Sequence, residues 1–574
     1  MYRGLVSILL LTMLLFSLAL IPPRAESAEQ KIYLALVWHY HQPWYYSVDE
    51  SYFTLPWVRM HSVGNYYKMA YILSKYPDVK GTFTFSGSLL EMLVDYVENG
   101  KMDIRQNISW KIVNGTVNKT EVFSMLRTPG GFFDINWNRI VNVIPRFSQL
   151  RSLAQSAFST CSATAVTEQE LVDCVVNQFT GGNLTGQNVV DLAVLFNLFW
   201  IDPSVAEEQY PDIYQLMNRA KQYSSPGFTV SDLQRILEVH EDIMSRITQI
   251  YRNLTSTGQA ELIPVPYSHP LAPIIVDLGW PEDIEVHVNV SIELFKRHFN
   301  YTPVGAWPAE QAVNSYVVEA FRKAGITWTI TDESILAKTG VSTSDINNLG
   351  VPWYIDFPSG RIYVFFRNTE LSNLLSFQYS NWNHVDAVND FVNKILSFRN
   401  QATGPRLVVV ALDGENPWEN YENFGDLFLN TLYQRITELQ GQGVLETVTP
   451  REFIERFPGT AKQLPLQNYQ YLDLAGKDIS NIPPVGYGDD YGSLPRKTVQ
   501  ARLPEGSWSG GELTTWIGDR QENVAWMWLA RARSGILERL GLGSFKQLYE
   551  QRPDIAKYLL KAEASDWWWW YGGG

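Results

Sequence analysis

The 574-residue sequence contains only two cysteines, Cys161 and Cys174. So few thiols do not favour a thiolate zinc site or a cysteine nucleophile, although outside the cell the pair could close a loop worth roughly 2–3 kcal/mol. Basic residues are also scarce, because 46 Lys+Arg stand against 60 Asp+Glu and give a formal net charge of −14. The chain therefore lacks the basic face of a nucleic-acid-binding protein, and we expect no nucleic-acid partner.

Several motifs of known chemistry are missing as well. No Gly-rich phosphate loop stands at a strand–helix junction, and no Gly-x-Ser-x-Gly elbow occurs. Nucleotide chemistry and the serine hydrolases built on that elbow are therefore disfavoured. The sequence shows no calcium-loop motif either, so we expect no required cofactor and leave calcium open.

The first 28 residues differ in character from the rest of the chain. Arg3 is followed by an apolar run from Leu5 to Ile21 and then by small residues up to Ala28, the pattern of a secretory signal peptide. The run is slightly long for a cleaved signal and slightly short for a membrane span, so retention as a membrane anchor stays open. We expect a secreted or cell-surface protein.

Glycosylation sequons agree with that location, since asparagines in this context are acceptors on secreted surfaces. There are seven of them: Asn107, Asn114, Asn118, Asn183, Asn253, Asn289 and Asn300. Aromatic residues are abundant, at 13% of the chain with 20 Trp and 30 Tyr. Large, rigid and half-wet rings suit stacking on sugar faces, although they could equally fill a large core.

Seven short β-rich runs bounded by turn signals predict strands in the first three quarters of the chain. They are Ile32–Val37, Gly81–Phe85, Leu262–Val265, Val304–Trp307, Ile326–Thr331, Ile362–Phe366 and Leu407–Leu412. Stretches long enough for crossover helices lie between most of them, such as Ala312–Ala324. This alternation predicts an α/β fold with a (β/α)7 barrel over residues 29–457.

Two regions depart from the alternation. Residues of about 95–260 are too long for a plain crossover, and we expect a helical insertion with an apolar helix over Val189–Trp200 and a capping box at Ser231 and Gln234. Residues 458–574 form the second region. There a loop rich in Gly and Pro precedes a helical stretch, Glu512–Leu540, that we expect to belong to a domain covering part of the barrel mouth.

Polar or ionisable residues stand at or just past the end of every predicted strand. In order they are His39 and His41, Ser86, His269, Glu310, Asp332 and Glu333, Arg367, and Asp413 and Glu415. The carboxyl ends of barrel strands meet at one mouth, where catalytic groups assemble. Among these residues Glu310 and Asp413 follow apolar strands and lie near tryptophans. Two such carboxyl groups are the minimal machinery for cleaving a glycosidic bond.

The arrangement of motifs resembles glycoside hydrolase family 57. The resemblance rests on His41-Gln42-Pro43, His269-Pro270, Gly305-x-Trp307-x-x-Glu310, Asp413-Gly414-Glu415-Asn416-x-Trp418-Glu419, and Trp516-Ile517-Gly518 through Asn523-x-Ala525-Trp526. Their order and spacing match over nearly the whole chain after residue 28. Within the family, Asp413–Glu419 and the closing Asp566–Gly572 look most like the amylopullulanases.

This resemblance implies a retaining α-glucan hydrolase in which Glu310 is the nucleophile and Asp413 the general acid/base. It also implies substrate-binding positions at His39, His41, His269, Trp307, Glu415 and Trp418. Glu310 would be ionised beside His41 and His269, whereas burial and the charge of Glu310 would raise the pKa of Asp413. The chain departs from the expected family pattern at two places: an Asp would be more usual after Arg367, and a Pro-containing turn would be expected at Phe85-Ser86-Gly87.

Two rival functions stay open on the sequence. His39-x-His41 with His269 could bind a divalent metal, as in polysaccharide deacetylases or zinc-dependent mannosidases. The chain could also be a non-catalytic surface protein that binds glycans through its tryptophans. The preference for α-1,4 or α-1,6 bonds, and for hydrolysis or sugar transfer, does not follow from the sequence.

Overall fold

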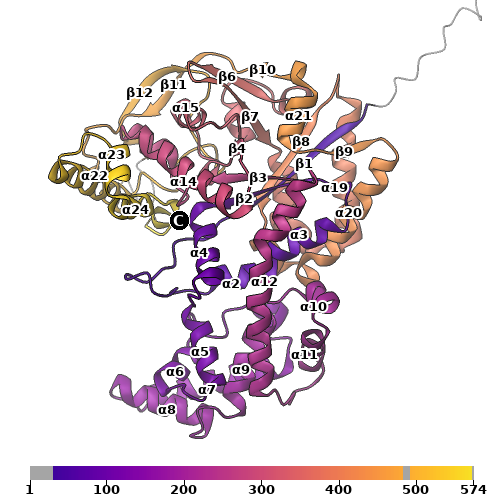
Figure 1. The fold of residues 1–574 in the computed structure, drawn as a ribbon, viewed down its shortest axis with the longest axis vertical. Coiled ribbons are helices and arrows are strands. Elements are labelled where there is room, and N and C mark those ends of the chain that lie inside the picture. The colour runs from indigo at the N-terminus through magenta and orange to yellow at the C-terminus, as the bar shows by residue number, and fades with distance from the viewer. Residues whose placement is uncertain (1–29, 483–490, 572–574) are drawn as a thin grey trace, which may run out of the picture.

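The computed structural model describes residues 30–482 and 491–571, and the expected signal peptide at residues 1–28 lies outside these ranges. Figure 1 shows the strands gathered in the upper half, a helical body below them and a group of C-terminal helices to one side. The barrel strands are β1 (Ile32–Tyr40), β2 (Gly81–Ser86), β3 (Ala260–Val265), β4 (Gly305–Ala306), β5 (Trp328–Asp332), β7 (Gly360–Arg367) and β8 (Leu407–Asp413).

These seven parallel strands confirm the predicted (β/α)7 barrel. Two arcs, β3-β2-β1-β8 and β4-β5-β7, form continuous ladders. A backbone hydrogen bond from Trp307 N to Pro264 O (2.9 Å) links β4 to β3, and one from Asn368 N to Val409 O (2.7 Å) links β7 to β8. The barrel is therefore closed at its mouth, although no continuous ladder of hydrogen bonds joins β3 to β4 or β7 to β8 among the described residues.

Smaller strands extend the barrel. β6 (Trp353–Phe357) forms an antiparallel hairpin with β7, and β9 (Leu445–Thr447) pairs with the start of β1. The helices around the barrel follow the strands in chain order. They are α2 (Trp57–His61), α3 (Tyr67–Ser74), α4 (Gly87–Glu98), α13 (Ala272–Asp277), α14 (Pro281–Phe299), α15 (Ser315–Lys323), α16 (Glu333–Ala337), α17 (Ile346–Leu349), α18 (Thr369–Asn373), α19 (His384–Ser397), α20 (Asp426–Gly441) and α21 (Pro450–Arg456).

A helical body lies between β2 and β3, where the long connection predicted it. It contains α5 (Ile104–Val113), α6 (Lys119–Leu126), α7 (Pro145–Ser162), α8 (Glu168–Thr180), α9 (Gln187–Leu198), α10 (Pro203–Gln209), α11 (Pro211–Gln222) and α12 (Val230–Ser256). The apolar α9 is almost entirely buried inside it, as its sequence predicts. The capping box of α12 is formed by Thr229 and Asp232 and not by Ser231 and Gln234, because the helix begins at Val230.

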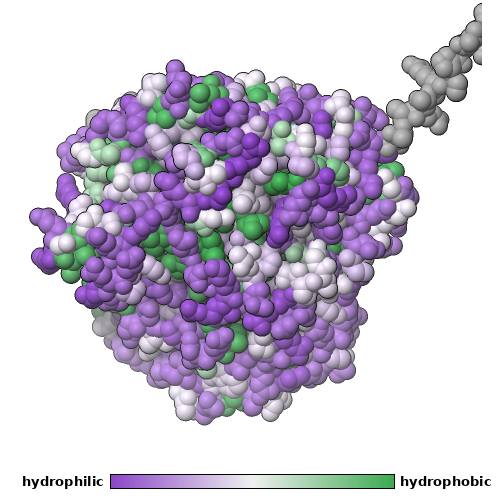
Figure 2. Space-filling model, turned by 45° about the horizontal axis from the view of Figure 1, so that its top comes forward, coloured by the Kyte–Doolittle hydropathy of each residue, from purple (hydrophilic) through white to green (hydrophobic). Residues whose placement is uncertain are grey.

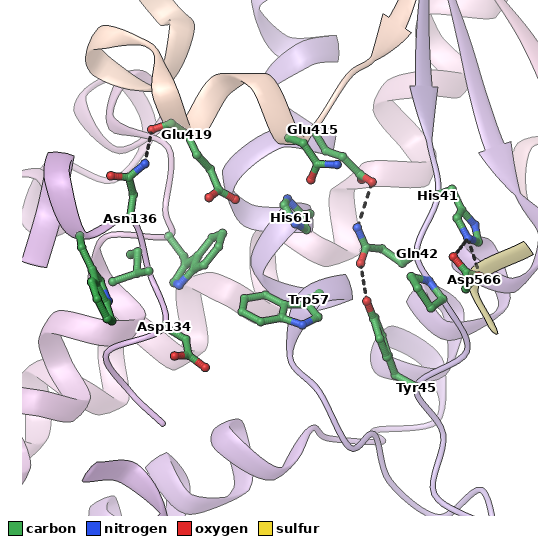
Figure 3. Close-up of a pocket in the computed structure, with 15 residues that line it drawn as sticks. His41, Gln42, Tyr45, Trp57, His61, Asp134, Asn136, Glu415, Glu419 and Asp566 are labelled. Carbon is green, nitrogen blue, oxygen red and sulfur yellow. Dashed lines mark hydrogen bonds and ion pairs between the residues drawn. The ribbon is translucent and has the colours of Figure 1, made fainter. Parts of the chain in front are cut away.

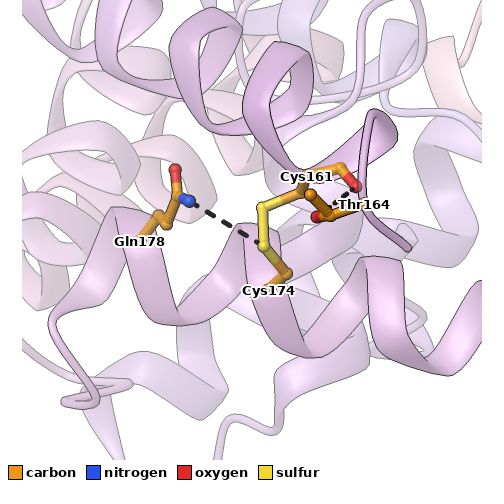
Figure 4. The surroundings of a disulfide bond; sticks show 4 residues. All are labelled: Cys161, Thr164, Cys174 and Gln178. Carbon is orange, nitrogen blue, oxygen red and sulfur yellow. Dashed lines mark hydrogen bonds between the residues drawn. A yellow bond between two sulfur atoms is a disulfide. The ribbon is translucent and has the colours of Figure 1, made fainter.

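A disulfide joins Cys161 at the end of α7 to Cys174 in α8 (Figure 4). It spans the turn between two antiparallel neighbours of the insertion. Both cysteines are thus used structurally, and the bond is of the kind found in oxidising compartments.

The C-terminal region follows α21 and packs beside the barrel mouth. Its elements are β10 (Lys462–Gln463), β11 (Gln467–Leu472), β12 (Arg496–Ala501), α22 (Arg520–Leu540), α23 (Phe545–Gln551), α24 (Pro553–Ala562) and α25 (Ser565–Trp569). The predicted helix over Glu512–Leu540 begins later than expected, at Arg520, because Asp519 and Glu522 form a capping box there. Trp516 consequently lies in the preceding loop, where it is buried.

The face shown in Figure 2 is mostly hydrophilic, with hydrophobic residues in small separate patches. All seven sequon asparagines are exposed. Over the described ranges no single helix is long and apolar enough to cross a membrane. The bent pair α9–α10 meets that test on length and composition, but α9 is part of the insertion's core.

Candidate active site

Strand periodicity brings the polar residues into the barrel mouth. Alternate side chains of a barrel strand point inwards. The core inside the barrel accordingly contains Tyr33, Ala35 and Val37 from β1 and Leu407, Val409 and Ala411 from β8. The next positions in the same alternation are His39 and Asp413, which are also register partners on the two neighbouring strands. The inward-facing residues of β1 and β8 are thus apolar along the strands and polar at the barrel mouth.

These groups surround a cavity of about 210 Å³. It is lined by His39, His41, His269, Trp307, Glu310, Gln311, Arg367, Asn373, Ser376, Phe377, Leu412, Asp413, Glu415, Asn416 and Trp508. The two predicted catalytic carboxyl groups therefore face one small space, although they are far apart in sequence. Seven of the eight predicted site residues line it, and Trp418 is the exception.

Three of the lining residues adopt strained backbone conformations. Glu310 has a φ of 57°, its neighbour Gln311 a φ of 47° and His269 a φ of 67°, in the left-handed region that non-glycine residues rarely occupy. Such conformations persist only where the surrounding structure imposes them, and they concentrate at functional sites. Glu310 and His269 each stand four residues after the end of a barrel strand, β4 and β3 respectively, and both line the mouth.

The Glu310 carboxyl is held by two donors from the C-terminal region. Trp508 donates its indole N–H to Oε2 at 2.8 Å, and the Ser565 hydroxyl lies 3.1 Å from Oε1. The expected neighbour His269 is further away, with Nδ1 at 3.7 Å from Oε1. Neither Trp508 nor Ser565 was predicted from the sequence, because both come from segments far from the barrel strands.

Three histidines form a connected group beside Glu310. The rings of His41 and His269 are stacked with centroids 3.9 Å apart, and His269 Nε2 lies 3.3 Å from His39 Nε2. His39 also stacks on Trp307, with centroids 4.6 Å apart. Burial and the neighbouring imidazoles hold the pKa of His39 and of His269 well below the usual range. Both rings are therefore neutral near pH 7 and supply hydrogen bonds and not charge.

His41 is fixed from two sides. Its Nδ1 shares a 2.8 Å hydrogen bond with the Ser86 hydroxyl, and its Nε2 lies 3.1 Å from both carboxylate oxygens of Asp566. Ser86 also caps α4 by accepting from Leu89 N. The serine that departs from the expected family pattern thus has a defined positioning role. Asp566, at the start of α25, is a further site residue for which the sequence analysis assigned no role.

Asp413 lies across the cavity at the end of β8. Although water reaches its carboxyl from the cavity, the surrounding protein removes much of its hydration, and this burial raises its pKa. Asn416 at 3.4 Å and the charge of Arg367 oppose the shift. The expected contribution of Glu310 is not among these causes, so burial alone accounts for the direction.

Burial also raises the pKa of Glu310, to about 7, with smaller contributions from the charges of Asp566 and Asp413. The donors Trp508 and Ser565 act in the opposite sense. The expectation that Glu310 is simply ionised is therefore too strong for the substrate-free protein. Near neutral pH the Glu310 carboxyl is therefore partly protonated in the substrate-free protein.

Arg367 orders the far side of the mouth. Its Nε donates to Asp332 Oδ2 at 2.8 Å and its Nη1 donates to Ala411 O at 3.1 Å. Thr369 donates its hydroxyl to the same Asp332 oxygen at 2.8 Å. The carboxylate expected just after Arg367 in sequence is in effect supplied by Asp332 from the neighbouring strand.

Glu415 lines the cavity as predicted, but Trp418 does not. Glu415 accepts hydrogen bonds from Gln42 Nε2 at 2.9 Å and from the Tyr66 hydroxyl. Trp418 is 0% exposed and donates its indole N–H to Gly414 O at 2.8 Å. The prediction that Trp418 binds substrate is wrong, because its ring has no face open to a sugar. It braces the loop that carries Glu415.

Distance alone would allow a metal ion at His41, His269 and Asp566, since one ligand atom from each lies within 4.8 Å of the others. The two rings, however, are only 8° from parallel, so their in-plane lone pairs do not converge on one point. Each ring nitrogen of both histidines also has a protein partner already. The arrangement fits a hydrogen-bond network better than a metal centre.

Comparisons with known proteins identify the family and the fold. The model of glycosyl hydrolase family 57 matches residues 35–465. A 4-alpha-glucanotransferase from Thermococcus kodakarensis is 25% identical over 184 residues. That match covers 32% of this chain and 26% of the relative, so the chain spans about a quarter of the length of the curated relative it matches.

Two solved structures share the fold. The branching enzyme of the same family type from Pyrococcus horikoshii superposes with a TM-score of 0.55 at 16% identity, covering 94% of this chain and 85% of that one. An α-amylase from Thermotoga maritima gives a TM-score of 0.51 at 13% identity, covering 95% and 88%. At these identities the likeness supports the fold and leaves the activity to be argued from the site.

Proposed function

Because the chain belongs to glycosyl hydrolase family 57, we propose that it is a retaining glycosidase that cleaves α-glucosidic bonds in an α-glucan such as amylose, starch or pullulan. The observation that carries the proposal is the convergence of Glu310 and Asp413 on one cavity of about 210 Å³. The names of two matched proteins, a 4-alpha-glucanotransferase and an alpha-amylase, support an α-glucan as the substrate class.

In the first half of the proposed reaction, Asp413 donates a proton to the leaving glycosidic oxygen. Glu310 attacks the anomeric carbon at the same time and forms a covalent glycosyl-enzyme. In the second half Asp413 removes a proton from water, which attacks the anomeric carbon, releases the sugar and regenerates the Glu310 carboxylate. A sugar hydroxyl in place of water would give transfer.

The hydrogen bonds around the two carboxyl groups favour this division of roles. Glu310 receives an N–H from Trp508 and is within hydrogen-bond distance of the Ser565 hydroxyl, and such donors stabilise the ionised form that a nucleophile requires. Asp413 has only the long contact from Asn416 and is held in a site where burial favours the proton. We therefore assign the nucleophile to Glu310 and the proton donor to Asp413.

We further propose an amylopullulanase-type enzyme that acts outside the cell. The closing Asp566–Gly572 motif supports the subtype. The exposed sequons, the Cys161–Cys174 disulfide and the secretory pattern before residue 29 support the location. The site residues proposed for substrate binding are His39, His41, His269, Trp307 and Glu415.

The decisive experiment incubates the protein with amylose and with pullulan and sizes the products, with the Glu310→Gln variant in parallel. We expect the wild type to yield oligosaccharides that first appear with the α-anomeric configuration, and the variant to lose activity by at least ~10³-fold. A wild type that binds these glucans but never cleaves them would instead support a glycan-binding protein.

The metal-dependent alternative is separated by a chelator. Hydrolysis by two carboxyl groups continues in EDTA, whereas a deacetylase or mannosidase that relies on a divalent cation stops. Assaying acetylated polysaccharide for released acetate gives the same distinction from the product side. Release of acetate with no sugar product would contradict the proposal.

A further inference from the structure

A second and larger cavity adjoins the catalytic one. It has a volume of about 700 Å³, within the range of small-molecule binding sites. The two cavities share His41, Glu415 and Asn416 in their linings. Figure 3 shows its wall assembled from the loop after β1, from α2, from the residues after β8, and from the segment 134–137 of the helical insertion. The insertion thus contributes directly to a space that opens beside the site of cleavage.

Aromatic rings form much of this wall. Trp57, Trp137 and Trp200 line the cavity, together with Tyr45. Trp57 and Trp200 lean on each other with ring centroids 5.8 Å apart. Trp137 is 39% exposed. The guanidinium of Arg151, which lies on α7, is 3.7 Å from the centroid of the Trp137 ring. Trp57 and Trp137 are partly exposed and braced by these neighbours, and such rings present flat apolar faces suited to pyranose rings, whereas Trp200 is only 6% exposed.

Polar groups among the rings lack partners. His61 is only 5% exposed and uses Nδ1 for a 2.8 Å hydrogen bond with Asn65, but its Nε2 has no partner among the described residues. Over the same residues, the Glu419 carboxyl and the Trp57 indole N–H also have none. Figure 3 shows Glu419 extending from its helical turn towards the cavity. All three side chains line the cavity, and Trp57 and Glu419 are partly exposed, so these polar groups are available to bond to solvent or to a ligand.

The protonation states of these groups indicate a neutral ligand. Burial lowers the pKa of His61 to about 4 and raises the pKa of Glu419 to about 7. Near neutral pH His61 is therefore uncharged, and Glu419 carries its proton in a large fraction of molecules. A neutral imidazole and a carboxyl group offer both donors and acceptors, which suits hydroxyl groups and gives no advantage to an ion.

We propose that this cavity binds glucosyl residues of the α-glucan substrate that lie beyond the scissile bond, stacked on Trp57 and Trp137 and hydrogen-bonded to His61 and Glu419. The inference rests on the proposed function for the nature of the substrate. It makes the helical insertion a determinant of chain-length preference. Binding energy from such remote residues raises kcat/KM only for substrates long enough to reach them.

The test measures kcat/KM for maltooligosaccharides of increasing length with the wild type and with Trp57→Ala. We expect the loss to be about tenfold for substrates that span both cavities and absent for the shortest one cleaved. Glu419→Ala removes a side chain that makes no hydrogen bond in the described structure, so it serves as a second variant that folds normally. Trp528→Ala, at a 70% exposed tryptophan on α22, is the matched control and should change nothing.

Two outcomes overturn the inference: an equal loss at every chain length, or no loss in either variant. Calorimetric binding of maltoheptaose to the Glu310→Gln protein separates this result from failure of the proposed function. A dissociation constant raised about tenfold by Trp57→Ala supports the cavity even if the wild type never cleaves an α-glucan. Cleavage by the wild type with unchanged binding in the variant leaves the proposed function intact and refutes the cavity.

Discussion

The two adjoining cavities differ in how their polar groups are satisfied. In the catalytic cavity the ionisable side chains bond to other side chains, as His269 does to Ser565 and Glu310 does to Trp508, although Trp307 Nε1 and the Gln311 amide have no partner in the described structure. In the larger aromatic cavity His61 and Glu419 leave polar atoms without partners in the described structure. The difference teaches that the first is pre-organised for chemistry, whereas the second keeps its hydrogen-bonding capacity for a ligand.

The difference has a structural origin. Catalytic side chains stand at strand ends, where register with neighbouring strands fixes them, as it fixes His39 opposite Asp413. The aromatic cavity is bounded instead by a short helix, a loop and the insertion. We expect changes in the first to affect the chemical step for every substrate and changes in the second to affect binding of long substrates.

The largest effect should come from Asp413→Asn. Without its proton donor the protein should lose at least ~10³-fold in kcat on natural glucans. An aryl α-glucoside whose leaving group needs no protonation should be attacked by Glu310 with a much smaller loss. If both substrates suffer alike, Asp413 is not the acid, and the assignment of chemistry to this cavity fails.

The free energy of unfolding, measured at two pH values, tests whether the catalytic cavity buries the charge of Glu310. Folding raises the pKa of Glu310 from 4.5 to about 7, so the folded protein binds this proton more tightly than the unfolded chain. The resulting stability is present below pH 4.5 and is lost as the pH rises through 7. Glu310→Gln should therefore be more stable than wild type by roughly 1–3 kcal/mol at pH 8.

The same variant should show no advantage at pH 4, where the wild-type carboxyl is protonated in both states. Urea unfolding at the two pH values measures the difference. A constant difference at both would mean that packing, and not the buried charge, explains it.

Asp566→Asn should give a moderate effect, with kcat reduced roughly tenfold because His41 loses its charged partner. Asp566 also raises the pKa of Glu310, so its removal should move the acid limb of kcat/KM to lower pH. Asp554→Asn on α24 is the matched control, since that exposed carboxylate pairs with Arg552 away from both cavities. A lower kcat with an unmoved acid limb would indicate a structural role only.

The smallest effect should follow Arg151→Ala, which removes the cation over Trp137. Loosening that ring should raise KM for long maltooligosaccharides about two- to threefold and leave the shortest substrate unaffected. Initial rates over a series of chain lengths measure it. A change in kcat at every chain length would contradict the claim that the larger cavity affects only the binding of long substrates.

Much of the barrel and of its mouth follows from the sequence, because both depend on local patterns. Short apolar runs predict β1 and β8, and the period of two along them carries His39 and Asp413 to the mouth. These features need only neighbouring residues and the rule that parallel strands end together.

Contacts made by distant segments could not be predicted in the same way. Trp508 lies in a loop, and Ser565 and Asp566 begin a five-residue helix. No periodicity links such residues to Glu310 or His41. The misplaced Trp418 has the same cause, since a tryptophan beside a catalytic motif serves core or ligand equally well and only its packing decides.

The position of α25 has a consequence during synthesis of the chain. His41 is translated early and its partner Asp566 is 525 residues later, so a nascent chain on the ribosome can assemble its barrel long before the mouth is complete. Proteolytic removal of the last helices would return the molecule to that unfinished condition. The contacts that hold His41 and Glu310 are therefore complete only after residues 565 and 566 have been synthesised.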